Sequence, residues 1–351
     1  CYQWEGNDYC TAQVGTVSGT SISFGSNYNF GHECYQTAIT YDANAQKVVV
    51  AYRRKSNSHG YAAVGTISGT SISFGSSTVF NAASVGSHFD IGYDANAQKI
   101  LVVYRDEGTS NHGKARVGTV SGTGISFGTE ATLQTVSTEW ISVGYDPSSQ
   151  KMLVVCTKNF DSVGYVGTIS GTDVSFGSFG DTGSWGYYND IVYDTNAQKM
   201  VVIFADNGDS SKLKYVSATI SGTSVTFSSS TTLASHSVLD PQIAYANGSL
   251  VSAFTDSSTS NYGDYVVFNQ AYSITRALTS ENFIGVSNAA YADGATATVQ
   301  IAGAVDDAQS GLTAGQSYYV QADGSLGTSP DTIAVMAGTA LSATQLSINP
   351  D

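Results

Sequence analysis

The stretch Val117-Gly-Thr-Val-Ser-Gly-Thr-Gly-Ile-Ser-Phe-Gly128 occurs five times in the chain, once in a loosened form. The other copies are VGTVSGTSISFG (14–25), VGTISGTSISFG (64–75), VGTISGTDVSFG (166–177) and SATISGTSVTFS (217–228). Their phenylalanines fall roughly 50 residues apart, a period typical of a repeat architecture.

Each copy predicts a β-hairpin. Val117 and Val120 precede a Ser-Gly-Thr segment, and Ile125 and Phe127 follow it. Glycine supplies the positive φ that a tight reversal needs. The alternative, a low-complexity Ser/Gly/Thr spacer, would not keep apolar residues at a fixed phase between turn residues.

A second repeated phrase lies between the hairpins. Its copies are ITYDANAQKVVVAY (39–52), IGYDANAQKILVVY (91–104), VGYDPSSQKMLVV (143–155), IVYDTNAQKMVVI (191–203) and the shortened IAYANGSLVSAF (243–254). The phrase predicts strand, polar turn and strand, and its continuously apolar second arm indicates a strand covered on both faces. Asp94 and Asn96 resemble calcium ligands, but the loop lacks the glycine and distal glutamate of an EF-hand. We therefore interpret them as Asx residues that bond their own backbone in the turn.

Two hairpins in each period make a four-stranded unit, with strands A (for example 88–94), B (99–105), C (114–120) and D (124–128). Radial repetition of such sheets is a β-propeller, so we predict an all-β propeller of about six four-stranded blades. Strand A suits the crowded innermost place, because the residue before its tyrosine is mostly small. A β-solenoid is the alternative, but its rungs are usually shorter.

The period sets the predicted domains. Residues 1–277 form the propeller, with a partial blade at 1–26 and further blades that begin near Tyr35, Ser87, Glu139, Tyr187 and Leu239. Residues 2–8 align with the end of a strand B (104–110), so either upstream sequence is missing or another segment supplies the inner strand. We favour missing upstream sequence. From about Leu278 the repeat stops, and residues 278–351 predict a small C-terminal β-rich module.

Composition narrows the classes of partner. The chain carries 14 Lys and Arg against 28 Asp and Glu, a net charge of −14, and an acidic surface repels a phosphate backbone. We therefore expect no nucleic-acid partner. The apolar runs are too short to span a bilayer and no signal peptide is present, so no membrane insertion is expected. Cys156 is expected to be a small buried hydrophobe, whereas pairing of Cys10 with Cys34 stays open because the redox compartment is undetermined.

Variation between repeats is confined to one set of connections. The A–B and C–D turns are nearly identical, whereas the B–C loops (53–61, 105–114, 157–164, 205–214) and the D–A connections (26–35, 129–139, 178–187, 228–238) all differ. These two sets lie on opposite faces of an up-and-down blade, so the diversified face is where binding residues are expected.

Five positions sharpen that prediction. Five residues before each repeat tyrosine stand Gln36, His88, Trp140, Tyr188 and Asp240, with Trp185 and Tyr187 close by. In a propeller these residues ring the axial mouth on the diversified face, where aromatic rings with polar neighbours suit a sugar. The alternative is that they simply plug the channel.

Catalytic signatures are weak. The histidines are dispersed without metal-ligand spacing, so we predict no metal and no cofactor. Asp90 and Asp190 occupy equivalent positions in alternate blades and match a carboxylate pair for glycosidic chemistry, but solvated channel carboxylates are the commoner explanation. The S-x-D-x-G-x-T-W boxes of sialidase propellers and a phosphate-binding loop are both missing, so we predict no catalytic residues and no enzyme.

Two motifs carry a resemblance. The Y-D-x-N-x-Q-K phrase with V-G-T-[VI]-S-G-T-x-[IV]-S-F-G resembles repeats in structural proteins of tailed phages, especially marine ones. The ending Gly311–Leu326 with Ala337–Leu346 resembles a small β-module at the C-termini of phage fibre and appendage proteins.

This resemblance implies an extracellular virion-surface appendage or tail fibre. Its propeller would attach to host glycan or another virion protein by non-covalent recognition, and its C-terminal module would mediate assembly, with a homo-oligomer as one form. The alternatives are a structural capsid or fibre decoration without receptor, a polysaccharide-degrading propeller, and a bacterial surface adhesin.

Overall fold

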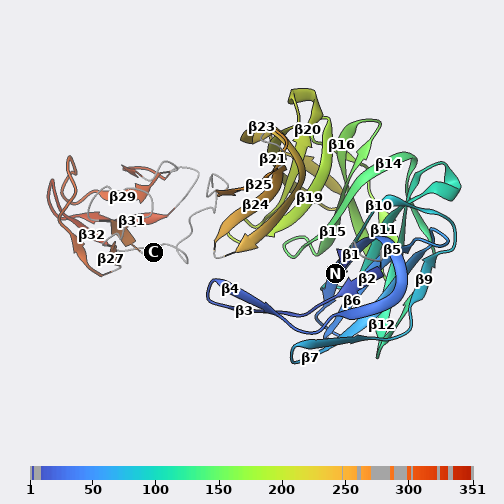
Figure 1. The fold of residues 1–351 in the computed structure, drawn as a ribbon. Coiled ribbons are helices and arrows are strands. Elements are labelled where there is room, and N and C mark those ends of the chain that lie inside the picture. The colour runs from blue at the N-terminus through green and yellow to red at the C-terminus, as the bar shows by residue number, and fades with distance from the viewer. Residues whose placement is uncertain are drawn as a thin grey trace. The chain divides into compact units, whose positions relative to one another are not determined.

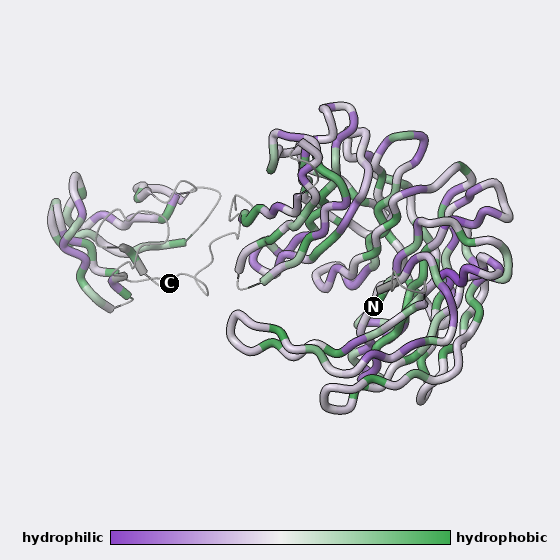
Figure 2. The backbone as a smooth tube through the Cα atoms, viewed as in Figure 1, coloured by the Kyte–Doolittle hydropathy of each residue, from purple (hydrophilic) through white to green (hydrophobic). Residues whose placement is uncertain are grey.

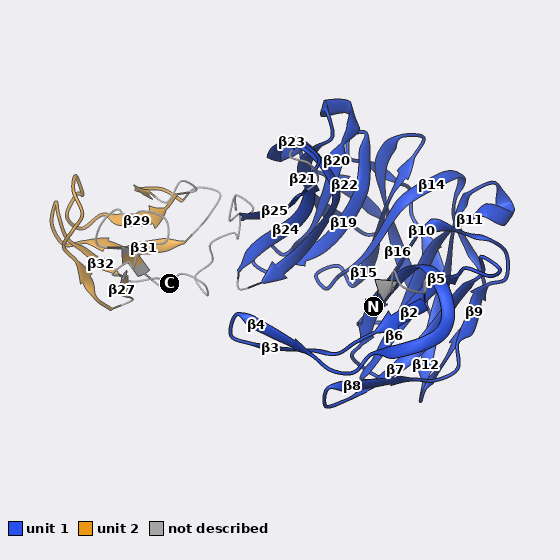
Figure 3. Ribbon diagram, viewed as in Figure 1, with its two compact units in different colours: residues 1–270 blue, residues 271–351 orange. Residues whose placement is uncertain are grey.

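The computed structural model describes residues 2–3, 9–246, 248–258, 262–269, 285–287, 299–301, 303–321, 325–330 and 335–348. The chain divides into two compact units, residues 1–270 and 271–351 (Figure 3). The boundary predicted at 277/278 lies outside the described residues. Within the described ranges, the structure holds no helix of the length and apolar character that a membrane span requires.

The first unit is a β-propeller of antiparallel sheets (Figure 1). Its innermost strands are β5 (Tyr28–Asp42), β10 (Val85–Asp94), β14 (Ala131–Asp146), β19 (Gly186–Asp194) and β23 (Thr231–Ala246), which begin the sheets that we call blades I to V. The second strands are β6 (Lys47–Arg54), β11 (Lys99–Asp106), β15 (Lys151–Lys158), β20 (Lys199–Asp206) and β24 (Ser249–Asp256). The third strands are β7 (Gly60–Ser68), β12 (His112–Ser121), β16 (Asp161–Ser170), β21 (Lys212–Ser221) and β25 (Tyr262–Phe268). The fourth strands are β8 (Ser71–Phe74), β13 (Gly124–Phe127), β17 (Asp173–Phe176) and β22 (Ser224–Phe227). The count of six blades stays a prediction.

Both predicted hairpins are confirmed. The C–D hairpin of blade II closes with Ser121 opposite Gly124, and Gly122 has φ +60° as the two-residue turn requires. In the A–B turn, Asp94 Oδ1 accepts the backbone N–H groups of Asn96 and Ala97 at 2.9 and 2.8 Å, which confirms the Asx interpretation.

Neighbouring sheets share their cores. One cluster joins Leu101 and Val103 of blade II to Met152 and Val154 of blade III, and similar clusters join the other successive pairs. The second strands of blades I to IV are buried almost throughout, as their apolar pattern predicts, and Figure 2 shows hydrophobic residues running along the blades. The sheets therefore pack face to face as in a propeller.

The D–A connections, which we predicted to be loops, are partly strands in the structure. The first halves of β14 and β23 are strands that pair with β12 and β21, and their second halves form the next innermost strand. One strand thus finishes a blade and starts the next. The alternation in Ala131-Thr-Leu-Gln-Thr-Val136 is the signal for this strand.

The last glycine of the repeat has a packing role. A Cβ on Gly75, Gly128 or Gly177 would collide with the backbone oxygen of the turn threonine in the next blade, Thr123, Thr172 or Thr223 respectively. The fifth copy ends in Ser228, and the region after it has lost the Ser-Gly-Thr turn. Glycine therefore stands where two hairpins meet.

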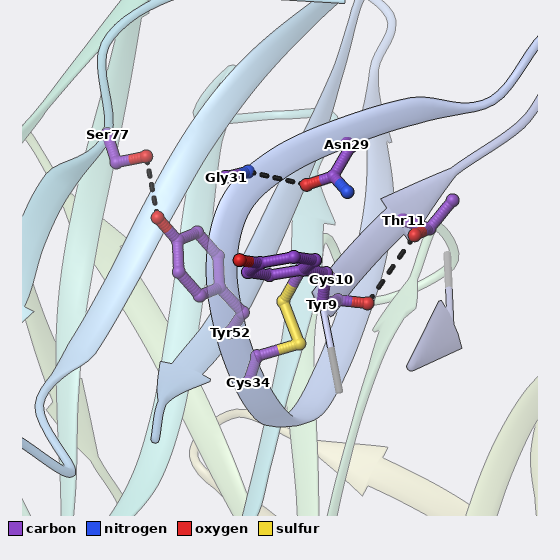
Figure 4. Close-up of a disulfide and its surroundings, with 8 residues drawn as sticks. All are labelled: Tyr9, Cys10, Thr11, Asn29, Gly31, Cys34, Tyr52 and Ser77. Atoms are coloured by element: carbon purple, nitrogen blue, oxygen red, sulfur yellow. Dashed lines mark hydrogen bonds between the residues drawn. A yellow bond between two sulfur atoms is a disulfide. The ribbon is translucent and has the colours of Figure 1, made fainter. Parts of the chain in front are cut away.

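The N-terminal segment contains β1 (Tyr2–Gln3), β2 (Tyr9–Ala12), β3 (Gly15–Ser18) and β4 (Ser21–Phe24). A disulfide joins Cys10 of β2 to Cys34 of β5, which settles the pairing left open by the sequence (Figure 4). Cys156 is free and buried, and burial raises the pKa of its thiol to about 12. The β3–β4 hairpin exposes Val17, Ile22 and Phe24.

The second unit contains a small sheet in the order β28-β32-β31-β29-β30 and a separate pair, β26 and β27. Their bounds are β26 (Gly285–Ser287), β27 (Val299–Ile301), β28 (Val305–Asp306), β29 (Ser317–Val320), β30 (Leu326–Gly327), β31 (Met336–Ala340) and β32 (Leu346–Ile348). Leu312, Tyr318, Ala337, Ala340 and Leu346 form its core.

Candidate functional site

Every innermost strand has a β-bulge a few residues before its repeat tyrosine. In β14, Trp140 and Ile141 lie between the paired residues Glu139 and Ser142, while the partner strand supplies one residue in the same interval. The register of β5, β10, β19 and β23 shifts at the corresponding place. Bulges bend a strand and redirect its side chains, and they are common beside functional sites.

Three of the predicted binding residues have left-handed backbone conformations at these bulges. Trp140, Tyr188 and Asp240 have φ values of 49°, 53° and 47°. Such values are unfavourable for side chains with a Cβ, and most of all for large ones. The packed sheets around the bulges must hold this strain, and strain of this kind tends to occur at functional sites.

The bulges surround a cavity of about 180 Å³. It is lined by Ser87, His88, Phe89, Trp140, Ile141, Tyr188, Asn189, Asp240 and Gln242. These residues come from β10, β14, β19 and β23, the innermost strands of four successive blades. Four strands in sequence reach one cavity only if the blades turn around an axis, which argues against a straight column of repeats.

Three rings form a packed cluster in the cavity. The His88 and Trp140 ring centroids are 4.4 Å apart, and those of Trp140 and Tyr188 are 4.0 Å apart. Asn189 makes two hydrogen bonds: its Nδ2 donates to the Trp140 carbonyl at 3.0 Å, and its Oδ1 accepts from the Ser162 hydroxyl at 2.7 Å. Hydrogen bonds through Asn189 thus connect the bulges of blades III and IV.

Polar groups accompany these rings. Trp140 Nε1 is buried without a hydrogen-bond partner in the described part of the chain, and an unpaired buried donor costs free energy. Burial lowers the pKa of His88 to about 4; the charge of Arg105 lowers it further, and the charge of Glu107 raises it. His88 is therefore neutral at pH 7. Burial and then Asp240 raise the pKa of Tyr188, whose hydroxyl therefore keeps its proton.

The other predicted residues lie outside the cavity lining. Trp185 and Tyr187 form an adjacent aromatic pair, with Trp185 Nε1 donating to the Tyr187 hydroxyl at 3.0 Å, and the Tyr187 ring is 6.0 Å from that of Trp140. Gln36 is half-buried with an unpartnered Oε1. The sequence-based prediction did not include Asn189 and Gln242. Gln242 could have been found, because it occupies the same position in its repeat as Asp90 and Asp190 do in theirs.

Asp90 and Asp190 bind neighbouring blades rather than lying free in solvent. Asp90 accepts the Val143 N–H at 2.8 Å, and Asp190 accepts the Ile243 N–H at 2.7 Å and the Ser142 hydroxyl at 3.3 Å. Burial raises the pKa of Asp90 to about 7, against hydrogen bonds that lower it and with a further contribution from the Asp190 charge. Burial also raises the pKa of Asp190. Their interpretation as solvated channel carboxylates is therefore wrong.

One histidine lies near two carboxylates. His236, Asp256 and Asp264 place one potential ligand atom each within 4.8 Å of one another, and His236 Nε2 is 3.7 Å from Asp256 Oδ2. Nitrogen and oxygen donors at such spacing can hold a divalent cation. The sequence hid this group because its members come from three different strands, β23, β24 and β25.

No protein-family model and no curated protein matches the chain. Among solved structures, the exo-β-1,3-galactanase of Phanerochaete chrysosporium gives a TM-score of 0.44 at 9% identity, over 66% of this chain and 59% of the galactanase. AofleA from Arthrobotrys oligospora, in a form with arginines replaced by alanine, gives 0.47 at 10% identity, over 75% of this chain and 83% of AofleA. CoXyl43, a GH43 β-xylosidase/α-arabinofuranosidase from a compost metagenome, gives a TM-score of 0.38 at 9% identity, over 68% of this chain and 91% of CoXyl43.

These likenesses correct one prediction. The sequence-based conclusion that the chain is not an enzyme is wrong, because glycoside hydrolases are among the structures that it resembles. The chain spans only 59% of the galactanase's length, and the likenesses themselves assign no activity to it. That conclusion treated Asp90 and Asp190 as ordinary solvated carboxylates, whereas each accepts a backbone N–H from the neighbouring blade.

Proposed function

We propose that the first unit binds carbohydrate at the cavity between its innermost strands. The observation that carries this proposal is the packed cluster of His88, Trp140 and Tyr188, with Asp240 and Gln242 in the same lining. Aromatic faces pack against the C–H face of a sugar, and the amide and carboxylate groups bind its hydroxyls. Because the lining is polar as well as aromatic, it suits a sugar better than a purely apolar ligand.

A glycan array followed by calorimetry tests this proposal. The wild-type protein is expected to bind a defined set of glycans, and Trp140→Ala and Tyr188→Ala are each expected to weaken binding at least tenfold, the scale of about 1.4 kcal/mol. Tyr262→Ala is the matched control, because it removes an exposed ring from β25 outside the cavity. Wild-type protein that binds no glycan, or variants that bind as tightly as wild type, would contradict the proposal.

Hydrolysis of the bound glycan is a second candidate, favoured by Asp90 and Asp190. A carboxyl group whose pKa lies near 7 can donate or accept a proton at neutral pH. Asp90 is the next residue in the chain after Phe89, which lines the cavity. Incubation with array-positive polysaccharide is expected to release oligosaccharide, and Asp90→Asn and Asp190→Asn are expected to abolish the release. An unchanged substrate would reject this candidate and leave carbohydrate binding intact.

We further propose that this binding serves a phage particle, with the chain as a virion-surface appendage for host attachment. The support is the resemblance of the repeat and of the C-terminal module to those of phage structural proteins. Mass spectrometry and antibody labelling of purified particles are expected to find the chain on the particle surface. Its absence from particles would reject the virion role without affecting the glycan site.

A further inference from the structure

A strained aromatic residue lies on the rim of blade III. Phe160 stands in the tight turn between β15 and β16, has φ +80°, and leaves 62% of its surface exposed. The corresponding turns of blades I, II and IV have small polar residues in left-handed conformations, Ser58, Asn111 and Ser211. A large side chain at positive φ is a rare outlier, and an exposed one gains little from packing. Fold stability alone therefore does not explain phenylalanine at this turn.

Phe160 begins a series of rings that ends at the cavity. Its ring centroid is 5.2 Å from that of Trp185, which is 6.1 Å from that of Tyr187, which is 6.0 Å from that of Trp140. Trp185 leaves 38% of its surface exposed. The hydrogen bond from Trp185 Nε1 to the Tyr187 hydroxyl links the two middle rings. Aromatic surface thus continues from the cavity lining to the rim.

The rim also has polar groups beside its rings. Asn159 and Asp161 flank Phe160 in the chain, and both are exposed. An aromatic face next to an amide and a carboxylate repeats the combination found in the cavity. The cavity, at about 180 Å³, is smaller than most sites that enclose a whole ligand. A carbohydrate with one end in the cavity would extend its remaining units outside it.

We propose that Phe160 and Trp185 form a second subsite, which binds a further sugar ring of a linear oligosaccharide whose terminal unit occupies the cavity. This inference rests on the proposed carbohydrate binding and specifies its ligand class: a chain of several sugar rings rather than a monosaccharide. Phe160 presents its ring to the sugar face, Trp185 extends that surface toward Tyr187, and Asn159 and Asp161 bind hydroxyl groups. The conformational strain at Phe160 keeps its ring exposed for that contact.

Chain-length dependence tests the second subsite. Calorimetry is performed with the monosaccharide, disaccharide and tetrasaccharide of one array-positive glycan. For wild-type protein the dissociation constant is expected to fall about tenfold from monosaccharide to tetrasaccharide, since one aromatic contact contributes on that scale. Phe160→Ala is expected to remove this gain and to leave monosaccharide binding unchanged. Phe179→Ala is the matched control, because Phe179 is an exposed ring of the same region that belongs to no ring contact in the series.

Phe160→Gly separates binding from folding. Glycine removes the ring and accepts positive φ, so the variant is expected to unfold at the same or a higher temperature than wild type while it loses the tetrasaccharide gain. Equal affinity of wild type for all chain lengths, or equal losses for monosaccharide and tetrasaccharide in Phe160→Ala, would overturn the second subsite. Failure of the carbohydrate proposal itself looks different: wild-type protein would bind no glycan, or Trp140→Ala would leave monosaccharide affinity unchanged.

Discussion

The two ends of each blade differ in how far their residues repeat from one blade to the next. At the end with the A–B and C–D turns, the chain repeats the same residues, and those residues contact the next blade: Gly128 meets Thr172, and Asn44 N–H donates to the Tyr93 hydroxyl at 3.2 Å. At the other end, the corresponding positions hold Gln36, His88, Trp140, Tyr188 and Asp240, and the backbone is bulged. Residues are identical where the hairpins of neighbouring blades meet, and they diverge where a cavity is lined. Sequence variation within one chain can therefore locate a binding site.

The largest expected effect tests the uniform end. Gly128→Ala places a Cβ against the Thr172 backbone oxygen, so the two hairpins must separate. We expect a loss of about 3 kcal/mol in the free energy of unfolding, the scale of overpacking a close contact. Urea denaturation followed by tryptophan fluorescence measures it.

Gly124→Ala is the control in the same hairpin. Its Cβ would meet nothing closer than the Ser121 oxygen at 3.7 Å, and other copies of the repeat have Ser or Asp at this position. A small effect is expected. If Gly124→Ala destabilised the protein as much as Gly128→Ala, the contact between blades would not be the reason for the repeated glycine.

A somewhat smaller effect is expected at the disulfide. Cys10 and Cys34 tie the N-terminal segment to blade I by a disulfide, whereas the later blades are joined within the described residues by packing, hydrogen bonds and ion pairs such as Arg105–Glu139. The bond closes a loop with a sequence separation of 24, so Cys10→Ser is expected to cost about 2–3 kcal/mol. Thermal unfolding with and without reductant measures this loss. Reductant is expected to lower the unfolding temperature of wild type to that of the variant and to leave the variant's unchanged. A reductant-dependent shift in both proteins would show that the disulfide is not the cause of the loss.

The raised pKa of Asp90 gives a pH-dependent prediction. The pKa of Asp90 is about 7 in the folded protein against 3.8 for the free group, so folding favours its protonated form. Its cost to stability is therefore absent below about pH 4, grows as pH rises toward 7, and is constant above it. Asp90→Asn removes the charge and retains an oxygen to accept the Val143 N–H. We expect the free energy of unfolding of this variant, relative to that of wild type, to rise by about 2 kcal/mol between pH 4 and pH 8, after allowance for solvent screening.

Chemical denaturation at several pH values checks this window. Asp161→Asn is the control for loss of an exposed negative charge. A stability difference between Asp90→Asn and wild type that stays the same from pH 4 to pH 8 would show that the pKa of Asp90 is the same in the folded and unfolded protein, and would weaken its candidacy as a proton donor.

Much of this organisation could be predicted from the sequence, and the rest depends on tertiary packing. The five hairpins follow from Ser-Gly-Thr turns and alternating apolar residues, and spacing from the repeat tyrosine brings four of the predicted residues, His88, Trp140, Tyr188 and Asp240, into one cavity. The bulges leave no such signal, because an extra residue in a strand changes neither composition nor polarity. The raised pKa of Asp90 depends on burial by neighbouring blades, and the exposed ring of Phe160 depends on a turn geometry that phenylalanine ordinarily disfavours.

The smallest expected effect concerns strain at the diversified end. Asp240 is exposed with φ 47°, so Asp240→Gly removes little packing and relieves the left-handed conformation. We expect a gain of about 0.5 kcal/mol in stability, because the greater chain entropy of unfolded glycine offsets part of the relief. Carbohydrate affinity is expected to fall, since the carboxylate leaves the cavity. Asp161→Gly is the control: Asp161 lies in β16 without positive φ, and glycine there is expected to destabilise the strand. Equal destabilisation in both variants would mean that the bulge conformation costs nothing, and strain would no longer distinguish the diversified end from the uniform one.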